Sequence, residues 1–180
     1  DRLMSRGLGD VYKRQYLGIV NNIEDLEIKS EKFEITDDEI LILNGDVELD
    51  FPDGLLNSQK VRVDKDRGYV DFKRQGQIFF KDYFFKAEEG TFSRDDGYIN
   101  LKNGEAFLNS RNLIISFERL SGDLDDKINL SNVQMTSCLD PTNGWAINAD
   151  KVSLDESTKR GIARNVRIKI LDKSLIKLPV

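Results

Sequence analysis

The chain has 180 residues, with 27 Lys and Arg against 32 Asp and Glu, a formal net charge of −5. Hydrophobic residues make up 39% and charged residues 33%, a composition that excludes both a transmembrane helical bundle and a disordered segment. The negative charge argues against nucleic acid as a partner, and the absence of histidine removes the commonest proton-transfer group and zinc ligand. We expect no cofactor, no metal and no enzymatic activity.

The first fifteen residues fit neither the period of a helix nor that of a strand. Their sequence, DRLMSRGLGDVYKRQ, is similar to a translated sequencing-adapter read-through, so we expect residues 1–15 to be non-native and to pack on nothing. We expect residues 16–25 to form a linker and residues 26–172 to form the folded domain. The native N-terminus, with any signal peptide, would then be missing.

From Leu26 onward, apolar and polar residues alternate in short stretches that Gly, Asn or Asp interrupts. This period of two is typical of strands with one buried face, and two strand types recur in alternation. The first type has a small residue followed by apolar residues three and five positions later, and copies begin at Ser30, Ser58, Ala87 and Ala149. A further copy is expected between Ser110 and Ser121, in a register that the pattern does not fix.

The second strand type has a polar residue followed directly by alternating apolar residues. Its copies begin at Asp46, Gln77, Glu105, Asn132 and Asn165, which lie 27 to 33 positions apart. The repeated pairs predict about ten strands. Because such strands must bury their apolar faces, we predict an all-β fold, an antiparallel β-jelly roll in two facing sheets.

If the two sheets splay apart, their inner faces form an apolar groove. A cluster of aromatic residues (Phe79, Phe80, Tyr83, Phe84, Phe85 and Phe92) supplies bulky lining, although the pattern alone favours a role in the core. The alternation assigns fourteen side chains to the predicted groove: Val47, Leu49, Val61, Val63, Ile78, Phe80, Phe92, Leu108, Val133, Met135, Val152, Leu154, Val166 and Ile168.

Acidic residues gather where turns are expected, as at Asp37, Asp64, Asp95 and Asp123. None of these runs has the alternating spacing, central Gly and terminal Glu of a helix-flanked calcium loop, so hairpin turns are the better interpretation. Cys138 has no histidine to activate it as a nucleophile. Lys and Arg are scattered over the predicted strands, which indicates a solvated outer face. We expect no catalytic residue and no metal ligand.

The last third of the chain carries the most specific pattern. A Thr-Ser-Cys run ends at Cys138, Trp145 follows, an Ala-Arg-Asn-Val-Arg run surrounds Asn165, and Pro179 comes near the end. In order and spacing, this pattern resembles the end of the N-terminal periplasmic domain of the LptD family of outer-membrane LPS-assembly proteins. The preceding repeats, from about Leu26, look like the OstA (organic solvent tolerance) unit.

This resemblance implies a β-taco, a jelly roll with partly splayed sheets, on the periplasmic side of the outer membrane of a Gram-negative bacterium. Its groove would receive the lipid A acyl chains of lipopolysaccharide (LPS) and pass the lipid to a C-terminal β-barrel, absent here, to which residues 173–180 would lead. The implied partners are a periplasmic OstA-like bridge protein that adds strand to strand, and an outer-membrane lipoprotein plug that binds through the barrel.

The resemblance also implies a disulfide between Cys138 and a cysteine outside this segment, although the N-terminal cysteine of the family has no counterpart here. Two alternatives stay open. One is a soluble periplasmic OstA-like bridge component of LPS transport, and the other is a structural β-repeat protein with a closed, dry core. Bound lipid or an open apolar cleft would argue against the structural protein.

Overall fold

The computed structural model describes residues 20–23, 26–38, 40–51, 54–81, 83–93, 97–108, 112–138, 144–171 and 173–178. The segment 1–15, expected to be non-native, lies outside them. In the part of the chain that is described, no helix has the length and apolar character needed to cross a membrane.

Within the described residues, fourteen strands form one sheet in which every pairing is antiparallel. They are β1 (Val20–Ile23), β2 (Leu26–Lys29), β3 (Lys32–Ile35), β4 (Ile40–Phe51), β5 (Gly54–Asp64), β6 (Tyr69–Phe80), β7 (Tyr83–Ser93), β8 (Tyr98–Leu108), β9 (Leu113–Asp123), β10 (Lys127–Thr136), β11 (Trp145–Asp155), β12 (Arg160–Arg164), β13 (Val166–Ile170) and β14 (Lys173–Leu178). The all-β antiparallel fold predicted from the sequence is confirmed.

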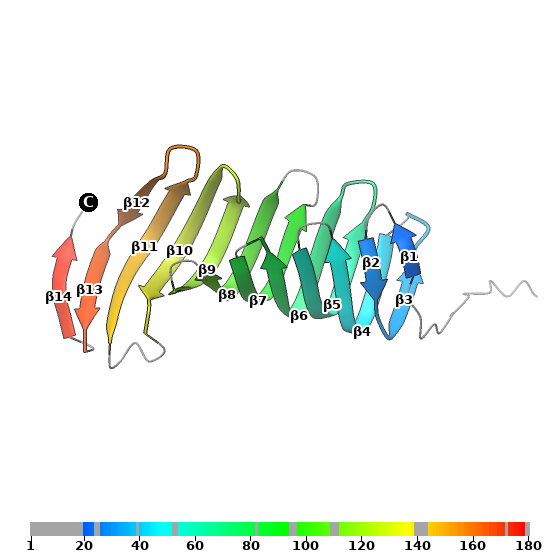
Figure 1. Cartoon of the computed structure of the whole chain (residues 1–180), viewed down its shortest axis with the longest axis horizontal. Helices are drawn as coiled ribbons and strands as arrows, with labels where there is room; N and C mark the ends of the chain where they lie inside the picture. The colour runs from blue at the N-terminus through cyan, green and yellow to red at the C-terminus, as the bar shows by residue number, and fades with distance from the viewer. Residues whose placement is uncertain are drawn as a thin grey trace, which may run out of the picture.

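The strands follow one another in chain order along the long axis of the molecule (Figure 1). Their number exceeds ten because the sheet is split at both ends and because β1 and β14 pair beyond the split strands. β2 and β3 pair with the two halves of β4, and β12 and β13 pair with the two halves of β11. β1 lies within the segment 16–25 and β14 within 173–180, and the domain boundaries stay predictions.

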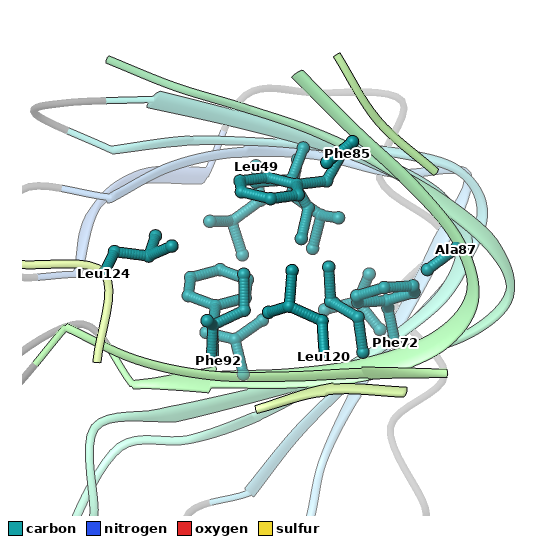
Figure 2. Packing of buried hydrophobic residues seen from close by; sticks show 14 of the residues in the cluster. Leu49, Phe72, Phe85, Ala87, Phe92, Leu120 and Leu124 are labelled. Carbon is teal, nitrogen blue, oxygen red and sulfur yellow. The ribbon is translucent and has the colours of Figure 1, made fainter. Parts of the chain in front are cut away.

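The two facing layers belong to one continuous sheet. Strands β4 to β11 are 10 to 12 residues long and bend near their middles, so the sheet folds into a U and its halves face each other (Figure 2). Layer one comprises residues 26–29, 47–51, 54–58, 76–80, 83–87, 104–108, 113–117, 133–136, 145–149 and 166–170. Layer two comprises residues 32–35, 40–44, 60–64, 69–73, 89–93, 98–102, 119–123, 127–131, 151–155 and 160–164.

The bend, here called the crease, is made by residues with left-handed backbone. Asp46, Gln75, Asn103, Asn132 and Asn165 have φ angles of 38°, 69°, 48°, 48° and 54°. Asn and Asp are the side chains that tolerate this conformation best, and one such residue in an antiparallel strand re-aims it as a bulge does. Three of the five begin copies of the second strand type, and the other two lie two residues before a copy, so the sequence repeat marks the crease.

Side chains across the crease hold these residues in place. The amide of Gln59 donates a hydrogen bond to the carboxylate of Asp46 at 2.7 Å, and the amide of Asn103 donates to Glu88 at 2.8 Å. Asn165 donates to Asp150 at 2.8 Å in the same arrangement. At these three places along the crease, an amide on one strand therefore meets a carboxylate on the neighbouring strand, on the outer surface.

Inside the crease the residues are small, because the two layers converge there. Ser58, Gly76, Ala87 and Gly104 follow one another across β5 to β8 as direct register partners. A Cβ added at Gly76 would meet the ring of Phe72. The small side chains thus leave room for a large ring that fills the fold.

Candidate functional site

The space between the layers is tightly filled along β4 to β9, here called the closed section. Leu49, Leu56, Val61 and Leu101 are completely buried there, and Phe72 is 1% exposed. Figure 2 shows Leu49 and Phe85 in one layer facing Phe72, Phe92 and Leu120 in the other. Bulky side chains from both layers meet, so this part of the interior is a dry core.

The space is less filled along β11 to β13, here called the open section. Leu154 is 37% exposed and Ile170 is 45% exposed. Both lie on the inner face, where their register partners on the neighbouring strands are Ile128 and Trp145 respectively. The register partner of Leu154 on β12 is Gly161, over which Leu154 itself lies, so β12 supplies no side chain to cover Leu154. The open section is therefore an apolar surface that is only partly covered, although Ala149 and Val152 are buried within it.

All fourteen predicted groove residues lie on the inner face of the sheet. Eight are buried: Val47, Leu49, Val61, Val63, Ile78, Phe92, Val133 and Val152. Four are partly buried against the core: Phe80, Leu108, Met135 and Val166. Of the last two, both in the open section, Leu154 is exposed and Ile168 is partly buried. Contact with a lipid stays a prediction for all of them.

The aromatic cluster is divided between the two faces by the alternation of the strands. Phe85 and Phe92 are buried in the core, and Tyr83 packs against it. Phe79 and Phe84 lie on the outer face, where their ring centroids are 4.7 Å apart and Phe79 is 44% exposed. The cluster therefore contributes to the core and to the outer surface, and lines the inner face only in part.

Sequence reasoning missed several inner-face residues. Phe72, Leu101 and Leu120 are buried in layer two, and the alternation around Phe72 was a readable signal for it. The copy of the first strand type expected between Ser110 and Ser121 has Phe117 where the other copies have a small residue. Its register partner on β8 is Gly104, so the small residue stands on the neighbouring strand instead. No strand pattern could identify Leu124, which follows β9 in a turn.

The side opposite the crease, where the strand ends of the two layers face each other, is here called the seam. Side chains from both layers bridge it near its middle. The rings of Phe51 in layer one and Phe92 in layer two lie 5.3 Å apart between centroids. Leu124 is 6% exposed, and Figure 2 shows its side chain between the layers on the side opposite Ala87. Outside it, Lys81 Nζ lies 3.0 Å from Asp125 Oδ1.

Charge is excluded from the space between the layers. In the described part of the chain the buried polar side chains are Ser58, Ser93 and Thr136, all neutral. The same part contains no group of His, Cys, Asp and Glu side chains able to hold a metal ion. The charged pairs lie outside, as where Glu48 accepts a hydrogen bond from Lys29 and raises the pKa of that amine. The inner face thus offers a ligand apolar contact.

Cys138 lies just after β10, at the seam end of layer one, and is partly exposed. Its backbone N–H donates a hydrogen bond to Thr136 Oγ1 at 3.0 Å. Thr136 Oγ1 in turn donates to the carbonyl of Trp145 at 2.6 Å, which ties the Thr-Ser-Cys run to the start of β11. The cysteine is held beside the open section at the surface.

Comparison with known proteins agrees with the C-terminal pattern. LPS-assembly protein LptD of Pseudoalteromonas translucida is 24% identical over 156 residues, which is 86% of this chain and 20% of that protein. LptD of Shewanella frigidimarina is 23% identical over 81% of the chain, and LptD of Alcanivorax borkumensis 22% over 94%. The chain is similar to LptD over most of its length. The resemblance found in the sequence is confirmed, and the chain spans about a fifth of the length of these LptD proteins.

No family model matches the chain. Among solved structures, the crystal structure of LptH, described as the LptA-homologous periplasmic component of the lipopolysaccharide transport device of Pseudomonas aeruginosa, covers 81% of this chain and 94% of its own. Its TM-score is 0.32 and its sequence identity 11%.

Proposed function

We propose that this domain is the periplasmic LPS-handling part of an LptD-like outer-membrane protein, and that it holds lipid A acyl chains between its two layers. The similarity to LptD supports the class of lipid. One observation carries the site: Leu154 and Ile170 are exposed on the inner face in the open section, whereas the apolar residues of the same face along β4 to β9 are buried or packed against the core. The domain passes the lipid onward and does no chemistry on it.

The physics of the open section suits an acyl chain. Each buried methylene is worth about 0.8 kcal/mol, so a chain of about twelve carbons gains on the order of 10 kcal/mol before the ordering of the chain is counted. The register places Ile128, Val166 and Ile168 on the same inner face as Leu154 and Ile170. Polar head groups would remain outside the seam, in water, and would not need to contact the acidic surface of the domain directly.

The ends of the sheet suit the proposed partners. β3 pairs with β4 alone and β12 with β11 alone within the described residues, so layer two ends in one such strand at each end. An edge strand can accept a strand from another domain, as the proposed OstA-like bridge protein would supply. The proposed β-barrel follows the C-terminal end and brings the lipoprotein plug with it.

Cys138 is the proposed covalent link to the rest of such a protein, by a disulfide to a cysteine beyond this segment. Its partial exposure at a strand end would give another thiol access. Alkylating reagents should label Cys138 in the isolated domain and leave it unlabelled in the oxidised full-length protein. Equal labelling in both would show that no such disulfide forms.

The closed section favours a second candidate, a structural β-repeat protein with a dry core. Four residues with no exposed surface show how completely this section is filled. This candidate predicts that lipid binds nowhere between the layers, whereas the LPS-handling proposal predicts binding in the open section at least.

Photo-crosslinking tests the proposal. A photoreactive amino acid at Leu154 or Ile168 should capture LPS, because both positions are accessible on the inner face. The matched controls are Ser153 and Lys169, the adjacent residues on the outer face, which should capture none. Equal labelling at inner and outer positions would refute the assignment, and no labelling at any position would favour the structural protein.

A further inference from the structure

An ion pair crosses the seam where the closed section meets β10. Lys81, at the end of β6 in layer one, reaches Asp125, in the turn after β9 in layer two, with Nζ 3.0 and 3.1 Å from the two carboxylate oxygens. Lys81 Nζ also lies 5.0 Å from the centre of the Phe80 ring. The ion pair therefore crosses from one layer to the other above an aromatic residue of the inner face.

Beneath the ion pair, Leu124 closes the same gap with an apolar side chain. A leucine in a hairpin turn is normally free to face solvent, yet Leu124 is only 6% exposed. Its backbone N–H donates to the carbonyl of Gly97 at 3.4 Å, which joins two neighbouring turns of layer two. Figure 2 shows the side chain directed into the interior from the side opposite the crease.

The ion pair contributes little to holding the fold together. Its two side chains are 44% and 71% exposed, and pairs so open to water are weak because solvent screens them. Its distinctive property is its position, since it joins residues 44 apart in sequence across the side on which the layers are not joined by backbone. A weak contact at that place can open without unfolding the sheet.

We propose that Lys81, Asp125 and Leu124 form a latch across the seam that controls whether an acyl chain can pass between the open section and the closed section. With the latch shut, Leu124 and the Phe51–Phe92 pair occupy the path of the chain. When the ion pair parts, the turn carrying Leu124 swings outward and an acyl chain takes its place between the layers. This inference rests on the proposed binding of lipid in the open section.

The test locks the latch covalently in the purified full chain. In a Cys138→Ser background, Lys81→Cys and Asp125→Cys are joined by a short bismaleimide, and LPS is captured by a photoreactive residue at Phe80 or at Ile168. Before locking, both positions should capture LPS. After locking, capture at Phe80 should fall at least tenfold while capture at Ile168 is unchanged.

The matched control locks an ion pair on the outer face. Lys102 Nζ lies 2.6 Å from Glu89 Oε1 on neighbouring strands of layer two, away from the seam. Joining Lys102→Cys to Glu89→Cys with the same reagent should leave capture at Phe80 unchanged. Equal capture at Phe80 with the seam locked and unlocked would overturn the latch.

A second pair of variants keeps the test independent of the cross-linker. Asp125→Lys should raise capture at Phe80 about threefold or more by placing two cations across the seam, and adding Lys81→Asp should restore the original level. An unchanged level in Asp125→Lys would contradict the latch. If Ile168 captures no LPS in any of these proteins, the proposed function itself fails, an outcome distinct from failure at Phe80 alone.

Discussion

The closed and open sections share one sheet, one repeat and one alternation of apolar residues, and they differ in how much side-chain volume faces inward. In the closed section Phe72 pairs with Val61 and, with Leu101, fills the space over Gly90, and nothing of Leu49 is left exposed. In the closed section Gly90 lies between Phe72 and Leu101, whereas in the open section Gly161 lies on β12, which pairs with β11 alone among the described strands. The same backbone plan thus yields a dry core along β4 to β9 and a partly uncovered apolar surface along β11 to β13.

The largest expected effect is a difference in the free energy of unfolding between two alanine substitutions, one in each section. Leu49→Ala removes a fully buried side chain and should destabilise the domain by about 3 kcal/mol, the sum of lost burial and a cavity. Ile168→Ala, on the inner face of the open section, should cost about 1 kcal/mol or less because that side chain is only partly buried. Urea unfolding of the two variants measures the difference, and equal losses would mean that the open section is packed like the core.

A smaller loss is expected from crowding the crease. Gly76→Ala places a methyl group against the Phe72 ring and should cost about 1–3 kcal/mol by overpacking. Combining it with Phe72→Leu, which shrinks the opposing side chain, should give a total loss smaller than the sum of the two separate losses. Additive losses in urea unfolding would show that the ring and the glycine do not share the space described.

The smallest expected effect is a pH dependence in the turn between β11 and β12. Backbone and hydroxyl hydrogen bonds from Thr158 and Ser157, each 2.8 Å long, lower the pKa of Asp155 below its ordinary value of 3.8. The lowered pKa contributes stability above the ordinary pKa, and this contribution is lost as the pH falls through the folded-state pKa. Asp155→Ala should therefore weaken the domain slightly at pH 7 and match the parent protein near pH 2. A difference that persists unchanged at low pH would remove this carboxylate as the cause.

Much of the fold could be predicted because the alternation of apolar residues and the sequence repeat both reflect strands that bury one face. Positions such as Val47 and Val61 alternate because strands turn every second residue inward, and those positions are buried. Asn132 and Asn165 were recognised as the starts of repeat copies, and both have the left-handed backbone that bends their strands. The local pattern therefore contained the crease, although it was interpreted as a series of strand starts.

The site could be predicted only in part, because openness depends on pairs of residues from different strands. The period of two puts Leu154 and Leu49 on the same face but cannot tell that one is covered and the other is not. Leu154 has Gly161 as its neighbour on β12, which pairs with β11 alone among the described strands, and this needs the register and the strand order. The seam contacts of Leu124 and Lys81 join distant turns and leave no periodic trace in the sequence.

Methyl-resolved NMR of the purified domain tests most directly whether acyl chains bind between the layers in the open section. Ile168 lies on the inner face there and Ile128 on the same face of the neighbouring strand β10, as the register partner of Leu154. Ile162, which is 64% exposed, faces outward from β12 and serves as an internal control. On titration with LPS, the Ile128 and Ile168 methyl signals should shift and saturate while the Ile162 signal stays in place. Shifts of equal size at Ile162, or no shift at Ile128 and Ile168 at saturating lipid, would contradict the account.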